Sequence, residues 1–323
     1  MLELSTELKY LTETNRLADY APYPKQREFH AAGASFRERL LMAGNQLGKT
    51  LAAAMEVAMH MTGRYPLWWD GYRFEHENRG WAAGKNGRAV REAMQVLLLG
   101  ANEKWGTGSI PKDCLIDVRM ARGVPGLVDS FTVKHRNGEM SSCTFKTYEE
   151  GRESWQAATL QWLWFDEEPP EDVYTEGLTR TNVTQGPVWI TFTPLLGMTN
   201  VVRRFYPTAT AFPNTAVTKM TIDDALHYDA AARAAVIATY KDHELKARAR
   251  GEPALGSGRV FPLDKDDIAV TAFPIPAHWP QIGALDFGWD HPSAGVKLAW
   301  DRDVDKIYVT AAHRKREQTP AMF

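Results

Sequence analysis

The sequence has few cysteines, almost no net charge and no long apolar run. Only Cys114 and Cys143 occur among 323 residues, without the spacing of metal ligands, and they are interpreted as reduced thiols of a cytosolic protein. The 38 basic and 40 acidic side chains nearly cancel, so nucleic acid would have to be bound by local basic patches. No apolar run approaches the roughly 20 residues of a membrane helix, and the first residues lack the pattern of a signal peptide. These absences argue against a disulfide scaffold and against a membrane protein.

Hydrophobic residues make up 44% of the chain, enough for a sizeable core, and their spacing alternates between strand-like and helix-like. Strands are predicted at 40–43, 79–84, 160–166 and 188–193, and helices at 3–20, 51–59, 86–100 and 229–250. Asn137-Gly138 separates strand-like runs at 131–135 and 142–146, which is a strong hairpin signal. This alternation predicts an α/β fold with a mostly parallel, doubly wound sheet.

A phosphate-binding loop is predicted between the first strand and the helix that follows it. The pattern [AG]-x-x-x-x-G-K-[ST] is matched by Ala43, Gly44, Asn45, Gln46, Leu47, Gly48, Lys49 and Thr50. The backbone N–H groups of such a loop face the β- and γ-phosphates, and the positive end of the next helix points to the same place. Lys49 would supply a point charge for the phosphate oxygens, and Thr50 would offer its hydroxyl to Mg²⁺. ATP and Mg²⁺ are therefore the expected cofactors.

A second motif is the apolar run that begins at residue 160 and ends in Asp166 and Glu167. Ligands bind at the carboxyl ends of strands in open α/β sheets, so Asp166 is placed to hold Mg²⁺ and Glu167 to activate a water molecule as general base. Taken alone, the run is equally well read as a core strand that ends in an acidic surface turn. Together with the loop it predicts an ATPase.

Two further polar positions belong to the predicted site. Gln26 precedes the loop, and its amide both donates and accepts hydrogen bonds, so it is able to recognise the edge of an adenine. The simpler interpretation is a solvated residue at the start of a helix. The strand at 188–193 ends in hydroxyl side chains, the last of which is Thr193.

The sequence changes character after a glycine-rich stretch at 251–258, which is the best candidate for a linker. Strands are predicted at 281–286, 294–300 and 306–310, with a turn at 301–305. Asp286 lies on the first of these apolar strands, where an unpaired carboxylate would be costly. Two or three strands without a helix cannot bury a good core, so this part is expected to be an incomplete domain or to pack on the first one.

Four features, in their order along the chain, resemble the large subunit of viral terminases, the DNA-packaging motors of tailed bacteriophages. They are Gln26, the loop at 43–50, the acidic pair at 166–167 and the hydroxyl strand end at Thr193. The resemblance implies a RecA-like ATPase of the additional-strand, catalytic-glutamate type at residues 1–199, with an N-terminal helix. It further implies a lid at 200–250, a linker at 251–263 and the first strands of an RNase H-like nuclease domain at 264–323.

By this resemblance Lys49 and Thr50 bind phosphate and Mg²⁺, Asp166 holds the metal, Glu167 is the catalytic base, and Thr193 senses the γ-phosphate. Many members of the family have an arginine in the loop where Asn45 stands here. An arginine from a neighbouring subunit would complete the site, and Arg152 is the candidate. The alternative is an ordinary surface arginine that pairs with Glu150 or Glu153.

Asp286 matches the first metal-binding carboxylate of the nuclease domain, which would use Mg²⁺ or Mn²⁺. The family's later carboxylates lie beyond Phe323, so this chain is expected to be truncated within the nuclease domain and not to cleave DNA. Double-stranded DNA contacts would come from scattered basic residues, for which the candidates are Arg119, Arg122, Lys134, Arg203 and Arg204.

The expected partners are double-stranded DNA, a portal protein, the small terminase subunit and further copies of the chain in a ring. The protein is expected in the host cytoplasm, where it docks transiently on a viral procapsid. It is not expected to bind a membrane or to be a component of the mature virion. A helicase-like or DNA-repair ATPase is the main alternative. A non-catalytic nucleotide-binding scaffold and a small-molecule kinase stay open as well.

Overall fold

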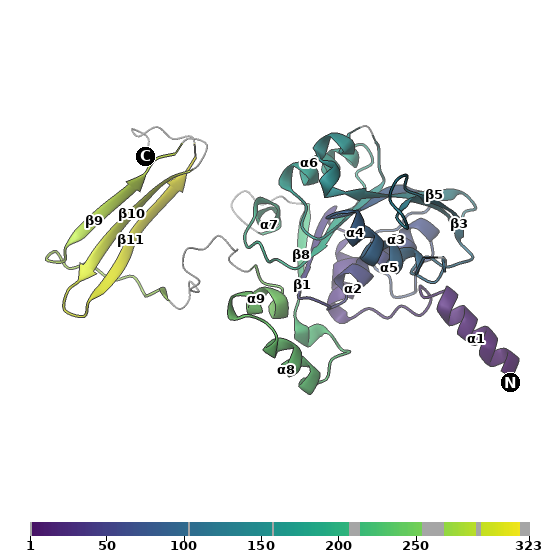
Figure 1. Cartoon of the computed structure of the whole chain (residues 1–323), viewed down its shortest axis with the longest axis horizontal. Helices are drawn as coiled ribbons and strands as arrows, with labels where there is room; N and C mark the ends of the chain where they lie inside the picture. The colour runs from purple at the N-terminus through teal and green to yellow at the C-terminus, as the bar shows by residue number, and fades with distance from the viewer. Residues whose placement is uncertain are drawn as a thin grey trace. The chain divides into compact units, whose positions relative to one another are not determined.

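A computed structural model of the chain divides it into two compact units, residues 1–262 and 263–323 (Figure 1). The structure describes residues 2–102, 104–156, 158–206, 214–253, 268–288 and 292–316. The division lies within the range predicted as a linker, 251–263, of which only residues 251–253 are among those described.

The first unit is built on one eight-stranded sheet. Its strands are β1 (Glu38–Ala43), β2 (Arg79–Gly84), β3 (Leu115–Met120), β4 (Val128–Lys134), β5 (Met140–Thr147), β6 (Trp162–Asp166), β7 (Val188–Phe192) and β8 (Thr215–Met220). They are arranged in the order β3-β4-β5-β2-β6-β7-β1-β8. All neighbouring pairs from β5 to β8 in this order are parallel, and the pairs β3–β4 and β4–β5 at one edge are antiparallel. The mostly parallel sheet and the hairpin around Asn137-Gly138 are therefore confirmed.

The strand that precedes the phosphate-binding loop and the strand that ends in the acidic pair are not neighbours. β7 lies between them and pairs with both in parallel. An additional strand at this position is the topology that the RecA-like prediction implies. All three strands are buried along their whole length, which explains why they read as continuous apolar runs.

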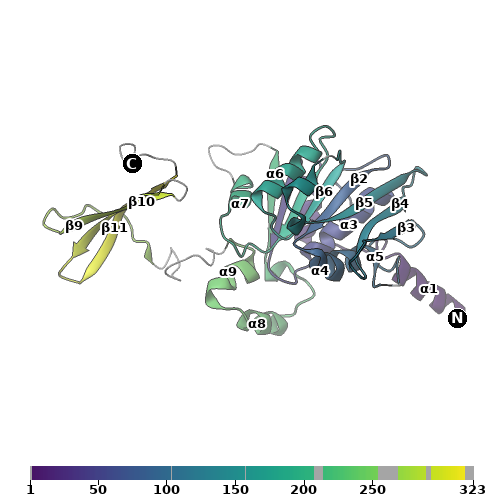
Figure 2. The same cartoon turned by 45° about the horizontal axis from the view of Figure 1, so that its top comes forward.

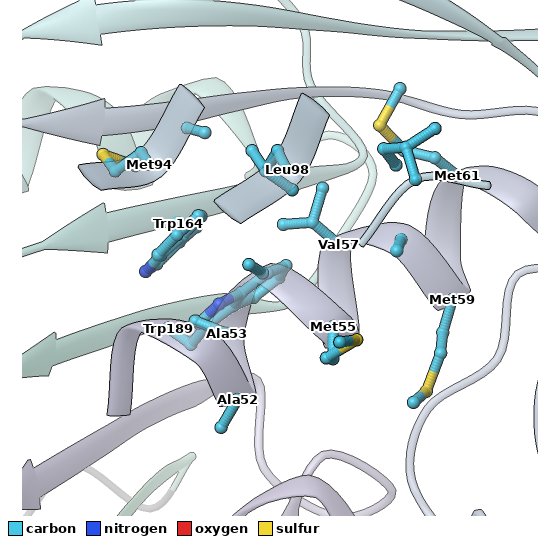
Figure 3. Packing of buried hydrophobic residues seen from close by; sticks show 14 of the residues in the cluster. Ala52, Ala53, Met55, Val57, Met59, Met61, Met94, Leu98, Trp164 and Trp189 are labelled. Carbon is cyan, nitrogen blue, oxygen red and sulfur yellow. The ribbon is translucent and has the colours of Figure 1, made fainter. Parts of the chain in front are cut away.

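Helices cover both faces of the sheet (Figure 2). On β6, Trp162 and Trp164 face a core that includes α3 (Lys49–Thr62), whereas Leu163 and Phe165 face the opposite core, which includes α6 (Glu171–Arg180). Figure 3 shows part of the α3 side, with Ala52, Ala53, Met55, Val57, Met59, Met61, Met94, Leu98, Trp164 and Trp189. The alternation of side chains along a strand thus produces two cores, one on each face.

The other described helices are α1 (Leu2–Thr14), α2 (Pro24–Ala32), α4 (Gly87–Ala89), α5 (Gln95–Leu99), α7 (Asn200–Arg204), α8 (Ala230–Ala238) and α9 (Asp242–Arg250). A π-helical segment at Val90–Met94 joins α4 to α5, and short 3₁₀ turns lie at Tyr148–Glu150, Arg152–Trp155 and Ile222–Asp224. No helix in this described part of the chain is long and apolar enough to cross a bilayer.

Two predicted helices differ from the structure, and two of its strands were not predicted. The helix expected at 3–20 ends at Thr14, and the helix expected at 229–250 is two helices separated by a break at 239–241. The strands β3 and β8 were not predicted from the sequence. β8 falls in the range assigned to a lid, but it pairs with β1 and so belongs to the main sheet.

A buried charged cluster lies where β1, α2 and α3 meet, and we call it the Glu56 cluster. It consists of Glu56, Arg39, His30 and His60, whose side chains are at most 1% exposed. Glu56 Oε2 accepts from Arg39 Nη1 at 3.2 Å and lies 2.6 Å from His30 Nδ1, while Oε1 lies 3.3 Å from His60 Nε2 and accepts from Arg39 Nη2. Burial acts to raise the pKa of Glu56, but Arg39 and the histidine hydrogen bonds outweigh it and hold that pKa well below its usual range.

The second unit contains a three-stranded antiparallel sheet in the order β11-β10-β9. Its strands are β9 (Gln281–Asp286), β10 (Ser293–Asp301) and β11 (Lys306–Lys315). The three strands and the turn at 301–305 agree with the sequence prediction. All of β9 is exposed, and large apolar side chains such as Ile282, Leu285, Ile307 and Val309 are at least 64% exposed.

Candidate active site

The phosphate-binding loop joins the end of β1 to the start of α3. Gly48 has a φ of 82° and Gln46 a φ of 58°, so both lie in the left-handed region. Glycine adopts this region without strain, whereas a glutamine does so only where its surroundings hold it there. The helix begins at Lys49, immediately after Gly48, so its first N–H groups face the loop.

Gly44 is required for a different reason, the close approach of another segment. A Cβ atom at this position would lie 1.8 Å from the carbonyl oxygen of Arg248 in the last turn of α9. A Cβ at Gly251, just past that helix, would lie 2.9 Å from the carbonyl oxygen of Met42. The end of α9 therefore packs directly on the loop and on the strand that leads into it.

Asp166 lies at the end of β6 and is buried beside the loop. Its Oδ1 accepts hydrogen bonds from Thr50 at 3.1 Å and from Thr191 at 2.9 Å, and Thr191 in turn accepts from Trp164 Nε1 at 2.9 Å. Burial, aided by the charge of Glu167, raises the pKa of Asp166 from 3.8 to about 7. A buried carboxylate beside a threonine hydroxyl is a hard oxygen donor set that fits Mg²⁺.

Glu167 stands at the transition from β6 to the following loop. Its Oε1 lies 4.0 Å from Lys49 Nζ, and its side chain is half exposed. Burial raises the pKa of its carboxyl group, against the opposing effect of the Lys49 charge. The residue has a φ of 65°, and its N–H donates to the carbonyl oxygen of Thr191 at 2.8 Å. The structure thus brings Lys49, Thr50, Asp166 and Glu167 together at the carboxyl edge of the sheet.

Thr193, just after β7, is in contact with the loop. Its Oγ1 donates to Asn45 Oδ1 at 3.0 Å. Asn45 is the position where the resemblance implies an arginine, so a neutral hydrogen bond here joins the loop to the end of β7.

Gln26 is only 2% exposed and makes contacts on both sides of its amide. Its Nε2 donates to the carbonyl oxygen of Gly48 at 3.0 Å, and its Oε1 accepts from the N–H of Tyr23 at 2.9 Å. Tyr23 also stacks on His227 and is hydrogen-bonded to it at 2.7 Å. Gln26 therefore supports the loop and the start of α2, and recognition of adenine stays a prediction.

Arg152 is exposed, but it does not pair with Glu150 or Glu153. Its Nε donates to Glu176 Oε2 at 3.1 Å, and Glu176 also accepts from Arg180. Glu150 is bound instead by Lys146 and by the backbone of Thr147. The alternative pairing with Glu150 or Glu153 is therefore wrong, since the partner of Arg152 is Glu176 of α6, which is distant in sequence.

Asp286 lies in the second unit, opposite Ala294 in the β9–β10 ladder. It is exposed, as is every residue of β9, so the burial cost expected for its carboxylate does not apply. Within the described ranges, no group of three or more His, Cys, Asp or Glu side chains is arranged to hold a metal ion. Asp290, which follows the same strand, lies outside the described residues.

Two of the five candidate DNA contacts already have acidic partners. Arg204 donates to Glu38 from Nε at 2.6 Å and from Nη2 at 2.9 Å, and Arg119 donates to Asp117 at 3.0 Å. A basic side chain that is bound by a carboxylate has less charge to offer to phosphate.

The sequence assigned no site role to two residues that touch the acidic strand end. Thr191 is one of the hydroxyl side chains at the end of the strand at 188–193, but its hydrogen bond to Asp166 was not predicted. Tyr148 is buried, with its hydroxyl 2.9 Å from the carbonyl oxygens of both Asp166 and Glu167. Burial, and to a smaller extent the nearby acidic groups, raises the pKa of the Tyr148 hydroxyl well above its usual range. The hydroxyl therefore keeps its proton and remains a hydrogen-bond donor. No local pattern marks Tyr148.

Comparison with known proteins identifies the family to which these features belong. The family described as "Terminase large subunit, T4likevirus-type, N-terminal" matches residues 40–266. The large terminase subunit of Salmonella phage P22 is 42% identical over 339 aligned residues, which cover 99% of this chain and 68% of that protein. The large terminase subunit of Enterobacteria phage LP7 is 31% identical over 344 residues, with coverage of 99% and 70%.

Solved structures agree in fold. The large terminase of a thermophilic bacteriophage has a TM-score of 0.56 at 17% identity and covers 93% of this chain and 71% of its own. The ATPase domain of the Thermus phage P74-26 large terminase has a TM-score of 0.52 at 16% identity, with coverage of 74% and 96%. The RecA-like α/β prediction for the first unit is confirmed by this likeness and by the position of β7. The chain belongs to the family of phage terminase large subunits.

Proposed function

We propose that this chain hydrolyses ATP at the loop 43–50 and the acidic pair 166–167, and that hydrolysis drives double-stranded DNA into a viral procapsid. The observation that carries the proposal is the meeting of Lys49, Thr50, Asp166 and Glu167 at one edge of the sheet. Structures of the thermophilic-bacteriophage large terminase in complex with ADP and with ATP-γ-S support the proposal that this chain binds a nucleotide.

Each of these groups has a role that its position allows. The loop N–H groups and Lys49 would bind the phosphates, and Thr50 and Asp166 would hold Mg²⁺, which neutralises charge on the phosphate oxygens. Glu167 would accept a proton from the attacking water. The raised pKa of its carboxyl group makes it a stronger base than a glutamate with the ordinary pKa. Arg152 of a neighbouring copy would have to leave Glu176 to stabilise the γ-phosphate.

Two contacts support coupling of the site to the rest of the chain. The Thr193–Asn45 hydrogen bond would respond to an occupied γ-phosphate position, as the resemblance implies for a coupling motif. The end of α9 packs on Gly44, so a change in loop conformation would move α9. We propose that the lid consists of the part of 200–250 outside β8, with α8 and α9 as its mobile elements.

The remaining partners are proposed from the family. A ring of copies would dock on a portal protein at the procapsid in the host cytoplasm, receive DNA from the small subunit and leave before the virion matures. A longer form would cleave DNA with an RNase H-like domain that uses Mg²⁺ or Mn²⁺, with Asp286 as its first ligand.

Asp166→Asn is expected to stabilise the metal-free protein while it removes the response to Mg²⁺. The folded pKa of Asp166 is about 7 against an ordinary 3.8, so the folded state loses stability as pH rises through this window. The amide of asparagine does not ionise, so the variant avoids this loss of stability. The loss is up to about 4 kcal/mol, since one pKa unit corresponds to about 1.36 kcal/mol. Thermal unfolding at about pH 8, with and without Mg²⁺ and ADP, measures both effects. An unchanged Mg²⁺ response in the variant would exclude Asp166 as a ligand.

The coupling to DNA is tested by ATP turnover in the presence of double-stranded DNA. We expect linear duplex DNA to raise phosphate release by the full chain, and the stimulation to fall with increasing salt, because contacts to the DNA backbone are electrostatic. Heparin serves as a polyanion control. Equal stimulation by heparin, or turnover that is indifferent to DNA, would count against translocation.

A further inference from the structure

The backbone at Glu167 has a conformation that residues with side chains rarely adopt. Its φ of 65° is in the left-handed region, which costs roughly 1–2 kcal/mol for a residue other than glycine. Such a conformation persists only where neighbouring groups hold it. On one side of the residue, the N–H of Glu167 donates to the carbonyl oxygen of Thr191 at 2.8 Å, which ties it to β7.

The other side of Glu167 is held by Tyr148. The Tyr148 hydroxyl lies 2.9 Å from the carbonyl oxygen of Glu167, 2.9 Å from that of Asp166 and 3.3 Å from that of Ala83. A phenol has one proton to donate, so the three carbonyl groups share one donor. The hydroxyl thus draws together the ends of β2 and β6 at the point where the chain turns into Glu167.

The position of Tyr148 follows from the sheet. It comes directly after Thr147, the last residue of β5, which pairs with Gly84 at the end of β2, and β2 pairs in turn with β6. The Tyr148 side chain is 7% exposed, and its ring packs against Trp155 and Phe165, with ring centroids 6.4 and 6.2 Å away. Burial of the ring against this aromatic pair restricts movement of the hydroxyl away from the carbonyl groups.

We propose that Tyr148 is a positioning residue for the Glu167 carboxylate, and that it acts through the backbone carbonyl groups of the acidic strand end. This inference rests on the proposed ATPase function, in which Glu167 activates water. Loss of the hydroxyl leaves the loop 43–50 and its phosphate contacts unchanged, but it frees the turn at Glu167. The consequence is a slower chemical step with nearly unchanged nucleotide binding.

The test is Tyr148→Phe in the full chain, which keeps the ring and removes only the hydroxyl. We expect kcat for ATP hydrolysis to fall by about tenfold to a hundredfold, since small errors in the placement of a catalytic group have effects of this size. KM for ATP and the affinity for ADP should stay within about twofold of wild type, because the binding contacts are retained. An unchanged kcat in a folded variant would overturn the proposal.

Tyr174→Phe is the matched control. Tyr174 is also buried, and its hydroxyl is 2.7 Å from Glu38 at the opposite end of the sheet, so the variant loses a comparable hydrogen bond without touching the site. A similar loss of kcat in both variants would show that Tyr148 has only a structural role and would overturn the proposal. 4-Aminophenylalanine at position 148 restores a donor and should recover turnover. A folded 4-aminophenylalanine variant with no recovery would also overturn the proposal. If the wild-type chain itself hydrolyses no ATP, the proposed function fails rather than the role of Tyr148.

Discussion

Glu167→Gln is expected to lower ATP turnover by about 100-fold to 10,000-fold, the range that a general base contributes. The amide fills the same space but cannot take a proton from water. Nucleotide affinity should change little, because the phosphate contacts come from the loop 43–50, Lys49 and Thr50. Steady-state phosphate release with Mg²⁺ and ATP, measured beside ADP binding, separates the two effects.

Glu171→Gln is the control for this substitution. Glu171 is exposed in the first turn of α6, where its carboxylate accepts a hydrogen bond from Asn200 at 2.6 Å. The variant makes the same chemical change nearby, so its turnover should match wild type. Equal losses in both variants would show a general effect of charge and would remove the case for Glu167 as the base.

Glu56→Gln is expected to destabilise the first unit by about 3–5 kcal/mol, the cost of breaking a buried ion pair by removal of one partner. The substitution keeps the volume but leaves the Arg39 guanidinium, which is 0% exposed, without its counter-charge. His30 and His60 lose the same acceptor. Urea unfolding, with the midpoint and slope both fitted, measures the change.

Glu28→Gln provides the comparison, since Glu28 pairs with Lys25 at the surface and such a pair contributes at most about 1 kcal/mol. A loss below about 1 kcal/mol for Glu56→Gln as well would contradict the importance assigned to the Glu56 cluster. The cluster also contributes to the pH dependence of stability, with the opposite sign to Asp166. Burial lowers the pKa of His60 below its ordinary value of 6.5. As the pH falls, His60 is therefore protonated in the unfolded chain before it is protonated in the folded protein, and stability decreases below about pH 6.5. The low pKa of Glu56 causes a further loss of stability when the pH falls below 4.5, the ordinary pKa of a glutamate.

Much of the central sheet could be predicted from sequence because its strands are buried on both faces. β1, β6 and β7 are therefore continuous apolar runs, and the loop between β1 and α3 has a local pattern of glycine, lysine and threonine. These signals are contained in short stretches of chain. They are sufficient to place Lys49, Thr50, Asp166 and Glu167 at one edge of the sheet.

The unpredicted elements lack such local signals. β8 is only partly buried and β3 is mostly exposed, so neither has a clear apolar pattern, and sheet pairing determines both. The break between α8 and α9 falls in an alanine-rich stretch where helix propensity alone favours one continuous helix.

The polar contacts of the site depend on residues that are distant in sequence. Tyr148 reaches Glu167 only because β2 lies between β5 and β6, and Thr193 reaches Asn45 only because β7 lies beside β1. The Glu56 cluster had one available signal, a single glutamate within the otherwise apolar run 51–59 of α3. A charge at a core position needs a partner, but the sequence does not name Arg39 as that partner.

Single-turnover cleavage of ATP, with the protein in excess over nucleotide and Mg²⁺ present, tests the ATPase site most directly because it isolates the chemical step from product release. We predict that wild type converts bound ATP to ADP, whereas Glu167→Gln retains ATP with a cleavage rate at least about 100-fold lower. Cleavage by Glu167→Gln at the wild-type rate would contradict the assignment of the site.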